Sequence, residues 1–416
     1  MRHSLIGLAG IFVVAACGAG DDTVAPPPTA TNEAPGVTSE PTADDESPEP
    51  EIVPFEIVPS SPVDVTVSGL TMHRERTVPD GAPTPLVEFD EIRSGGPPPD
   101  GIPPVDEPKF LNVGDVDFLA DNEPVLALEI DGDARAYPVQ IMTWHEIAND
   151  TVGGVPVAVS YCPLCNSAVA YDRRLDDRVL DFGTSGLLYN SALVMYDRQT
   201  ETLWSHFTGE GIIGELTGTD LDVFPLATVS WQTFREANPD GLVLSRDTGF
   251  SRDYGRNPYP GYDDVDGVPF LFEGEVDGRY TALTRIVGVE DGAAAVGIPL
   301  ADLRDAEVVT GSIDGRPLMA WWASGTASAL ESSAIVDGVD VGATGVFVPV
   351  VDGTPLTFSA VGDGTFTDAE TGSTWNLLGE AVAGDLSGSR LEPYVHVDTF
   401  WFAWSTFRPD TEIVTG

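Results

Sequence analysis

The stretch PVAVSYCPLCNSAVAY, residues 156–171, carries the strongest local signal for the fold. A short strand-like run stands on either side of the pentapeptide CPLCN, which predicts a strand, a tight turn and a second strand. Asn166 follows the second cysteine, where such a turn needs a left-handed backbone, and asparagine tolerates that conformation second best after glycine. We therefore expect Cys162 and Cys165 to place both sulfur atoms on one side of a turn. No convincing helix follows them.

Beyond residue 105, short strand-like runs separated by turns recur along the rest of the chain. Turn-forming Asp-Gly and Gly-Gly pairs separate short apolar runs at 131–132, 153–154, 314–315 and 352–353. Helical patterns are confined to 138–149, 228–237 and 398–408. Regularly spaced short strands with few short helices predict a β-dominated α+β fold.

An internal duplication organises this region. Segments 125–244 and 286–414 contain the same motifs in the same order, and Trp204 falls where the second copy has Trp375. A tryptophan at one place in both copies is most simply a core anchor. Further along, Trp231-x-x-Phe234 is matched with Trp404-x-x-Phe407. We expect two tandem β-rich lobes packed as a pseudo-symmetric pair, with a first lobe at 106–245, an inter-repeat segment at 246–285 and a second, degenerate lobe at 286–416.

The two copies differ at three residues with reactive side chains. The first lobe has His145, Cys162 and Cys165, and the corresponding residues of the second lobe are Ala306, Ala323 and Thr326. The fold therefore does not need these side chains, and their joint absence suggests that they act together. Glu146 and Asp150 also lie near His145, but at helical spacing in so acidic a chain we expect them to face solvent or to cap the helix.

The amino terminus has the pattern of an export signal. Arg2 precedes an apolar run, residues 5–14, that is too short to span a membrane as a mature helix. Val14-Ala15-Ala16-Cys17 resembles a bacterial lipoprotein cleavage site. We predict removal of residues 1–16, a lipid on Cys17 and an extracytoplasmic location on a bacterial membrane. An ordinary secretory signal and an uncleaved anchor are the alternatives.

Composition and charge limit the partners of the chain. Residues 17–105 are rich in Pro, Thr, Glu and Asp, which predicts a disordered stalk between the lipid and the lobes. The net charge is -47 with Lys109 as the one lysine, so binding to nucleic acid through a basic face is not expected. A protein partner is not indicated by any motif.

Several long motifs resemble a bacterial domain of unknown function, family 3179, over roughly residues 110–415. They are WHEIAND (144–150), GGVP (153–156), YCPLC (161–165), FGTSGLLYNS (182–191), MYDRQT (195–200) and DYGRNPY (253–259). The resemblance implies no activity, because the family has none to carry over. It does mark His145, Cys162 and Cys165 as motif positions.

One interpretation of this trio is a soft-metal site. Two thiolates and an imidazole select copper or zinc, and His206, Met195, Asp172 or an external ligand would complete the coordination. The leading prediction is thus a binding module, rather than a hydrolase, with a copper or zinc site in the first lobe.

Two alternatives stay open for the same cysteines. Outside the cytoplasm they could form an inert structural disulfide, in which case His145 is an ordinary hydrogen-bonded residue. They could also form a redox-active dithiol, in which His145 lowers a thiol pKa. The sequence alone leaves catalysis undecided.

Overall fold

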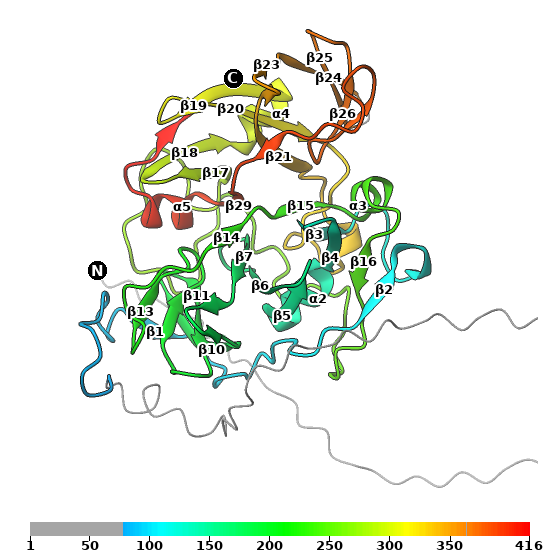
Figure 1. The fold of residues 1–416 in the computed structure, drawn as a ribbon. Coiled ribbons are helices and arrows are strands. Elements are labelled where there is room, and N and C mark those ends of the chain that lie inside the picture. The colour runs from blue at the N-terminus through cyan, green and yellow to red at the C-terminus, as the bar shows by residue number, and fades with distance from the viewer. Residues whose placement is uncertain (1–77, 363) are drawn as a thin grey trace, which may run out of the picture. The chain divides into compact units, whose positions relative to one another are not determined.

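Short strands in two similar series, each with two short helices, build the part of the chain that the structure describes (Figure 1). The structure is a computed structural model and describes residues 78–362 and 364–416. The predicted signal, the lipidation residue Cys17 and residues 18–77 of the predicted stalk lie outside the described residues.

The first series runs from residue 92 to residue 244. Its elements are β1 (Ile92–Ser94), β2 (Phe110–Asn112), β3 (Pro124–Ile130), β4 (Asp133–Pro138), α2 (Val139–His145), β5 (Ile147–Val152), β6 (Val155–Cys162), β7 (Ser167–Asp172), β8 (Arg174–Leu175), β9 (Arg178–Val179), β10 (Phe182–Tyr189), β11 (Ala192–Asp197), β12 (Leu203–Ser205), β13 (Gly211–Ile213), β14 (Val223–Phe224), β15 (Ala227–Ser230), α3 (Trp231–Ala237) and β16 (Leu242–Leu244). A short 3-10 turn, Val113–Asp115, follows β2.

The second series runs from residue 285 to residue 413. Its elements are β17 (Arg285–Asp291), β18 (Ala294–Pro299), α4 (Leu300–Ala306), β19 (Val308–Ile313), β20 (Arg316–Ala323), β21 (Ala343–Val348), β22 (Val350–Val351), β23 (Thr354–Pro355), β24 (Phe358–Gly362), β25 (Thr365–Asp368), β26 (Thr374–Asn376), β27 (Ala381–Ala383), β28 (Glu392–Pro393), β29 (His396–Phe400), α5 (Trp401–Phe407) and β30 (Glu412–Ile413). A 3-10 turn, Ile335–Asp337, lies between β20 and β21.

Strand pairing is equivalent in the two series. The sheet β14-β7-β6-β5 has the same order as β28-β21-β20-β19, and β10-β11-β12-β13 the same as β24-β25-β26-β27. The strands β15-β3-β4-β16 correspond to β29-β17-β18-β30, and the pairs β4-β16 and β18-β30 are both parallel. The first series adds one edge strand to each of two sheets, β2 beside β16 and β1 beside β10. The chain is therefore a β-dominated α+β protein, as the sequence predicted.

The local geometry repeats as closely as the topology. Helices α2 and α4 each begin after a proline, and each is followed by a glutamate with positive φ, 59° at Glu146 and 60° at Glu307. The buried Trp204 donates its indole N–H to Asp197 over 2.9 Å, and Trp375 does the same to Asp368 over 2.9 Å. Both tryptophans are thus core anchors, as expected.

One detail of the sequence match is wrong by a helical turn. Helix α3 begins at Trp231 and α5 begins at Trp401, each directly after the strand that leads into it. Trp231 therefore corresponds to Trp401, and Phe234 to Trp404, rather than to residues three positions later. Aromatic side chains at a spacing of three recur within α5, so the sequence pattern alone fits two registers.

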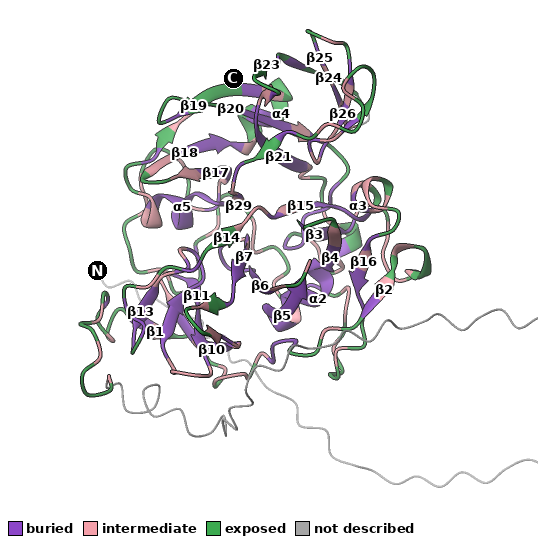
Figure 2. Cartoon of the chain, viewed as in Figure 1, coloured by how far each residue is buried: buried purple, intermediate pink, exposed green. Residues whose placement is uncertain are grey.

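The described residues belong to one compact unit, in which the two series interlock reciprocally. Strand β29 of the second series contacts β7 of the first, and its counterpart β15 contacts β21, the counterpart of β7 (Figure 1). One apolar cluster joins Val125 and Val229 to Trp321 and Phe347 across the two series. Figure 2 shows that β6, β7 and α2 are buried elements.

Residues 78–105 differ from the predicted stalk. Strand β1 pairs with β10, and the buried Val87 and Ile92 pack in an apolar cluster with Val194 and Tyr196. These side chains supply the apolar surface that a disordered segment lacks, so the boundary of the predicted stalk at 105 lies too far along the chain.

Candidate functional site

The two cysteines lie on a turn between two neighbouring strands. Strand β6 ends at Cys162, residues 163–166 form the turn, and Ser167 begins β7 opposite Cys162. Asn166 has φ 51° and donates its backbone N–H to the Pro163 carbonyl over 3.2 Å. The predicted hairpin and its left-handed asparagine are therefore both present.

The sulfur atoms of the turn face each other in the protein interior. Cys162 and Cys165 are free thiols with Sγ atoms 2.7 Å apart. Both side chains are buried, with exposed fractions of 1% and 0%. The pair is thus close enough to share a proton or to become linked by a disulfide after a small movement.

The surroundings shift the pKa values of the two thiols in opposite directions. Burial raises the pKa of the Cys162 thiol, but hydrogen bonds from Cys165 and from backbone N–H groups outweigh this and leave its pKa below the ordinary value. These N–H groups belong to Leu164, Cys165 and Leu193. Burial and the neighbouring Cys162 raise the pKa of Cys165 well above its ordinary value. Cys162 is therefore the cysteine that ionises first.

The second series covers the turn. The Cys165 carbonyl accepts hydrogen bonds from the Phe400 N–H at 3.1 Å and the Thr399 hydroxyl at 2.7 Å. Both donors are on β29, the strand that contacts β7. The cysteine turn therefore lies where the first series meets the second.

Both ring nitrogens of His145 have hydrogen-bond partners other than the cysteines. Its Nδ1 is 2.6 Å from the Pro103 carbonyl oxygen and its Nε2 is 2.6 Å from the Tyr254 hydroxyl. Burial lowers the pKa of His145, and the nearby Arg252 lowers it further. The neutral His145 ring therefore forms hydrogen bonds to both Pro103 and Tyr254, and Tyr254 belongs to the inter-repeat segment.

His206 contacts Ser167, the residue that begins β7 after the cysteine turn, and Met195 belongs to the apolar cluster that contains the cysteines. His206 is fully buried between the Ser160 and Ser167 hydroxyls, each 2.9 Å from one ring nitrogen. Met195 lies on β11 opposite Trp204, in the apolar cluster that also contains both cysteines. Across residues 78–362 and 364–416, no cluster of three or more His, Cys, Asp or Glu side chains could hold a metal ion.

Glu146 is the site residue that the sequence misassigned. Helix α2 ends at His145, so Glu146 takes the left-handed position after it, and Asp150 lies on β5 rather than on the helix. The Glu146 side chain is 7% exposed and forms no ion pair with any residue that the structure describes. Burial raises its pKa well above the ordinary value, and the Cys162 sulfur adds to this. Asp150 is also buried and forms an ion pair with Arg135.

The second series has the same backbone as this site but lacks the polar side chains of Cys162, Ser160, Ser167 and His206. Ala323 pairs with Ala343 where Cys162 pairs with Ser167. By the same register Trp321 stands at the place of Ser160, and Leu377 follows β26 as His206 follows β12. The Trp321 indole donates to the Leu377 carbonyl, over 2.9 Å, and fills this region with apolar atoms. Glu307 retains the left-handed position but is exposed.

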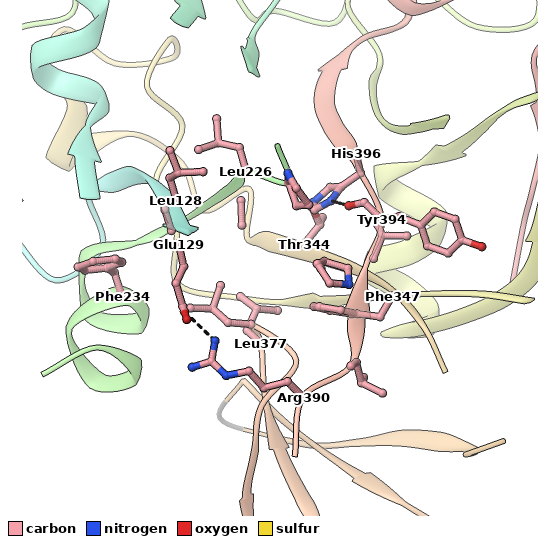
Figure 3. A pocket seen from close by; sticks show the side chains of 18 of the residues that line it. Leu128, Glu129, Leu226, Phe234, Thr344, Phe347, Leu377, Arg390, Tyr394 and His396 are labelled. Carbon is pink, nitrogen blue, oxygen red and sulfur yellow. Dashed lines mark hydrogen bonds and ion pairs between the residues drawn. The ribbon is translucent and has the colours of Figure 1, made fainter. Parts of the chain in front are cut away.

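A separate cavity of about 220 Å³ lies between the two series (Figure 3). Leu128, Leu226 and Phe234 of the first series and Phe347 and Leu377 of the second line it. An ion pair between Arg390 and Glu129, with N and O atoms 2.7 Å apart, and the His396 ring add polar groups. Neither cysteine lines this cavity.

The comparisons with known proteins identify a family and nothing narrower. No curated protein and no solved structure matches the chain. The family described as a protein of unknown function (DUF3179) matches residues 99–411, which include the hairpin, the buried glutamate and all strands of the two series except β1 and β30. The chain is therefore a member of the DUF3179 family.

Proposed function

We propose that Cys162 and Cys165 act as a redox-active dithiol that exchanges electrons with a disulfide partner. The observation that carries this proposal is the pair of Sγ atoms 2.7 Å apart with opposite pKa shifts. A lowered thiol pKa in an attacking cysteine and a raised one in its neighbour suit successive steps of thiol–disulfide exchange.

The exchange needs no component beyond the partner disulfide. The Cys162 thiolate attacks one sulfur of R–S–S–R, which forms a mixed disulfide and releases one R–S⁻ with the electron pair of the broken bond. Cys165 then attacks Cys162, closes the Cys162–Cys165 disulfide and releases the second R–S⁻. The two thiol protons end on the two departing thiolates. In total the protein loses two electrons and two protons, and the partner becomes two thiols.

Glu146 supports this chemistry rather than the inert alternative. A buried carboxyl group without an ion-pair partner among the described residues costs stability, and the second series keeps its equivalent in solvent. Placed beside Cys162 with a raised pKa, it can take up or return a proton when the sulfur changes state.

Both cysteines are buried, so a partner disulfide reaches the sulfurs only when neighbouring side chains move. Tyr259 and Tyr262, in the inter-repeat segment, pack against the cluster that contains both cysteines. Burial raises the pKa of both phenols; Cys162 adds to the rise at each of them, and Cys165 adds to it at Tyr262. We propose that displacement of these rings admits the partner disulfide.

The test uses the full chain purified from its native compartment. Thiols are trapped with acid and alkylated, and metal content is measured on the same sample. We expect a Cys162–Cys165 pair that a dithiol reductant opens and a small disulfide closes again. An equimolar copper or zinc ion that protects both thiols would instead establish the soft-metal proposal, with Met195 in the same cluster as a candidate ligand. A disulfide that resists reduction in the native protein would establish the structural alternative.

We also propose that the chain is exported and carries a lipid on Cys17. This rests on the signal pattern of the sequence. Within the part of the chain that the structure covers, no helix has the length and apolar character needed to cross a membrane. Labelling with a radioactive fatty acid is expected to mark the wild type and to leave Cys17→Ala unlabelled. Equal labelling of both would refute lipidation.

A further inference from the structure

The cavity of about 220 Å³ between the two series has a smaller counterpart. The counterpart, of about 80 Å³, is lined from α5 and β7, whereas the larger cavity is lined from the equivalent elements α3 and β21. Leu226 and His396, which hold equivalent positions ahead of α3 and α5, line both cavities. The two cavities are therefore equivalent places in the duplicated fold, and their different sizes come from the side chains that line them.

The larger cavity has smaller side chains at two of the equivalent positions. Trp404 of α5 and Phe207 line the smaller cavity. Phe234 and Leu378 stand at the same places in the larger one. A protein core is normally packed with few voids larger than a water molecule. The open space is thus a feature of this side of the molecule that the duplicated backbone does not require.

His396 brings an unpaired polar atom to the larger cavity. Its side chain is 9% exposed, and its Nδ1 lies 3.3 Å from the Tyr394 backbone oxygen (Figure 3). A carbonyl oxygen only accepts hydrogen bonds, so the ring proton is on Nδ1, and Nε2 of the neutral ring has a lone pair. Among the described residues, no donor reaches Nε2. A buried acceptor without a donor lowers stability, so a donor on a bound molecule would complete this site.

The other charged groups of the cavity disfavour an anionic ligand. Arg390, at the end of the cavity away from His396, forms ion pairs with Glu129 at 2.7 Å and with Glu380 at 3.8 Å (Figure 3). Its charge is thus already compensated, in a chain with a net charge of -47. The rings of Phe234 and Phe347 line the space between the two ends. This lining favours an uncharged aromatic ligand.

We infer that the cavity binds a small uncharged phenol, whose ring packs against the apolar lining and whose hydroxyl donates to His396 Nε2. A cavity of about 150 Å³ accepts benzene, so by proportion this one accepts about nine non-hydrogen atoms. The Arg390 side chain is 54% exposed, so the ion-pair end of the cavity is the end nearer to solvent. Neither cysteine lines the cavity, and binding there does not depend on the proposed dithiol function.

The first test compares two probes that differ by one hydroxyl group, 4-ethylphenol and ethylbenzene. Calorimetric titration of the full chain should show saturable binding of both. His396→Leu, which installs the side chain of the equivalent Leu226, removes the acceptor and keeps the apolar lining. We expect it to weaken 4-ethylphenol binding about fivefold, the factor for one hydrogen bond of ~1 kcal/mol, and to leave ethylbenzene within about twofold.

The second test fills the cavity with the side chains of its counterpart. Leu378→Phe copies Phe207, and Phe234→Trp copies Trp404. Each variant is expected to lose saturable binding of both probes, and the thermal unfolding transition shows which variants are folded. Because the two positions lie on different elements, one variant remains informative if the other does not fold.

The third test places the hydroxyl. With ¹⁵N-labelled histidine, 4-ethylphenol is expected to shift the His396 Nε2 signal, whereas ethylbenzene leaves it nearly unchanged. The signals of His145 and His206 should stay constant with both probes, because neither residue lines the cavity.

Three results would contradict the proposed site. No saturable binding of either probe to the wild type would refute it outright. Binding that survives in folded Leu378→Phe and Phe234→Trp would place the probes elsewhere on the protein. Equal 4-ethylphenol affinity in the wild type and His396→Leu, without a shift at Nε2, would show that no ligand hydroxyl meets His396. Each of these outcomes can be obtained whether or not the two cysteines exchange with a disulfide.

Discussion

Glu146→Gln, with Glu307→Gln as its matched control, tests the electrostatic description of the cysteine site. Both glutamates follow a seven-residue helix in the same left-handed conformation, but Glu146 is buried and Glu307 is exposed. The amide of glutamine has nearly the same shape as the carboxyl group and does not ionise. The two variants therefore differ only in the surroundings of the charge that is removed.

The sign of the effect follows from the raised pKa of Glu146. Above the ordinary value of 4.5 the folded protein holds a proton that the unfolded chain has released. Wild-type stability consequently falls as the pH rises from 4.5 to the pKa of the folded state, by up to about 1.4 kcal/mol per pH unit. Below 4.5 the carboxyl group is protonated in both states and the loss disappears.

The measurement is the free energy of unfolding in denaturant between pH 4.5 and pH 8, with reductant present. Glu146→Gln is expected to gain stability over the wild type with rising pH, at the slope given above. Glu307→Gln should differ from the wild type by a constant amount, because its side chain lies in solvent. Other carboxylates cancel in these differences. If the Glu146→Gln and wild-type curves run parallel, the conclusion that burial raises the pKa of the Glu146 carboxyl group is wrong.

Three further predictions concern the cysteine turn, the tryptophan anchors and His145. Asn166→Ala is expected to lower the free energy of unfolding by about 1–2 kcal/mol, because residue 166 has a left-handed backbone that alanine disfavours. Asn166→Gly should stay close to the wild type. Equal losses in the two variants would argue against the turn geometry. Trp204→Phe and Trp375→Phe each leave a buried aspartate without its indole donor. Calorimetry should show a similar loss of stability for both variants, roughly 2–4 kcal/mol. A neutral result for one of them would contradict the equivalence of the two tryptophans. His145→Gln removes the contact with Tyr254 and should lower the stability of the protein. The ratio of dithiol to disulfide in a redox buffer should stay unchanged. A changed ratio would show that His145 affects the cysteines.

The sequence predicted those features that depend on short-range patterns. Alternating apolar residues around CPLCN specify the hairpin, and Asn166 specifies its left-handed position. The repeated Trp204 and Trp375 identify core anchors. All of these are local choices of backbone or side chain, for which neighbouring residues carry enough information.

The partners of buried polar side chains could not be predicted in the same way. His145 is hydrogen-bonded to residues 42 and 109 positions away, and its residue type fits a metal ligand equally well. Glu146 belongs to an acidic chain in which most carboxylates lie in solvent, and only the end of α2 at His145 turns this one inward. The line of Ser160, Ser167 and His206 arises from the pairing of β6 with β7 and from a loop that returns about 40 residues later.

The reduction potential of the Cys162–Cys165 pair tests the central claim most directly. The full chain is equilibrated in dithiothreitol buffers of graded potential, and the fraction of free thiols is read by alkylation and mass spectrometry. A redox-active dithiol predicts a midpoint between roughly -270 and -120 mV, within the range of thiol–disulfide oxidoreductases. A midpoint below about -300 mV, typical of structural disulfides, would contradict the proposed function.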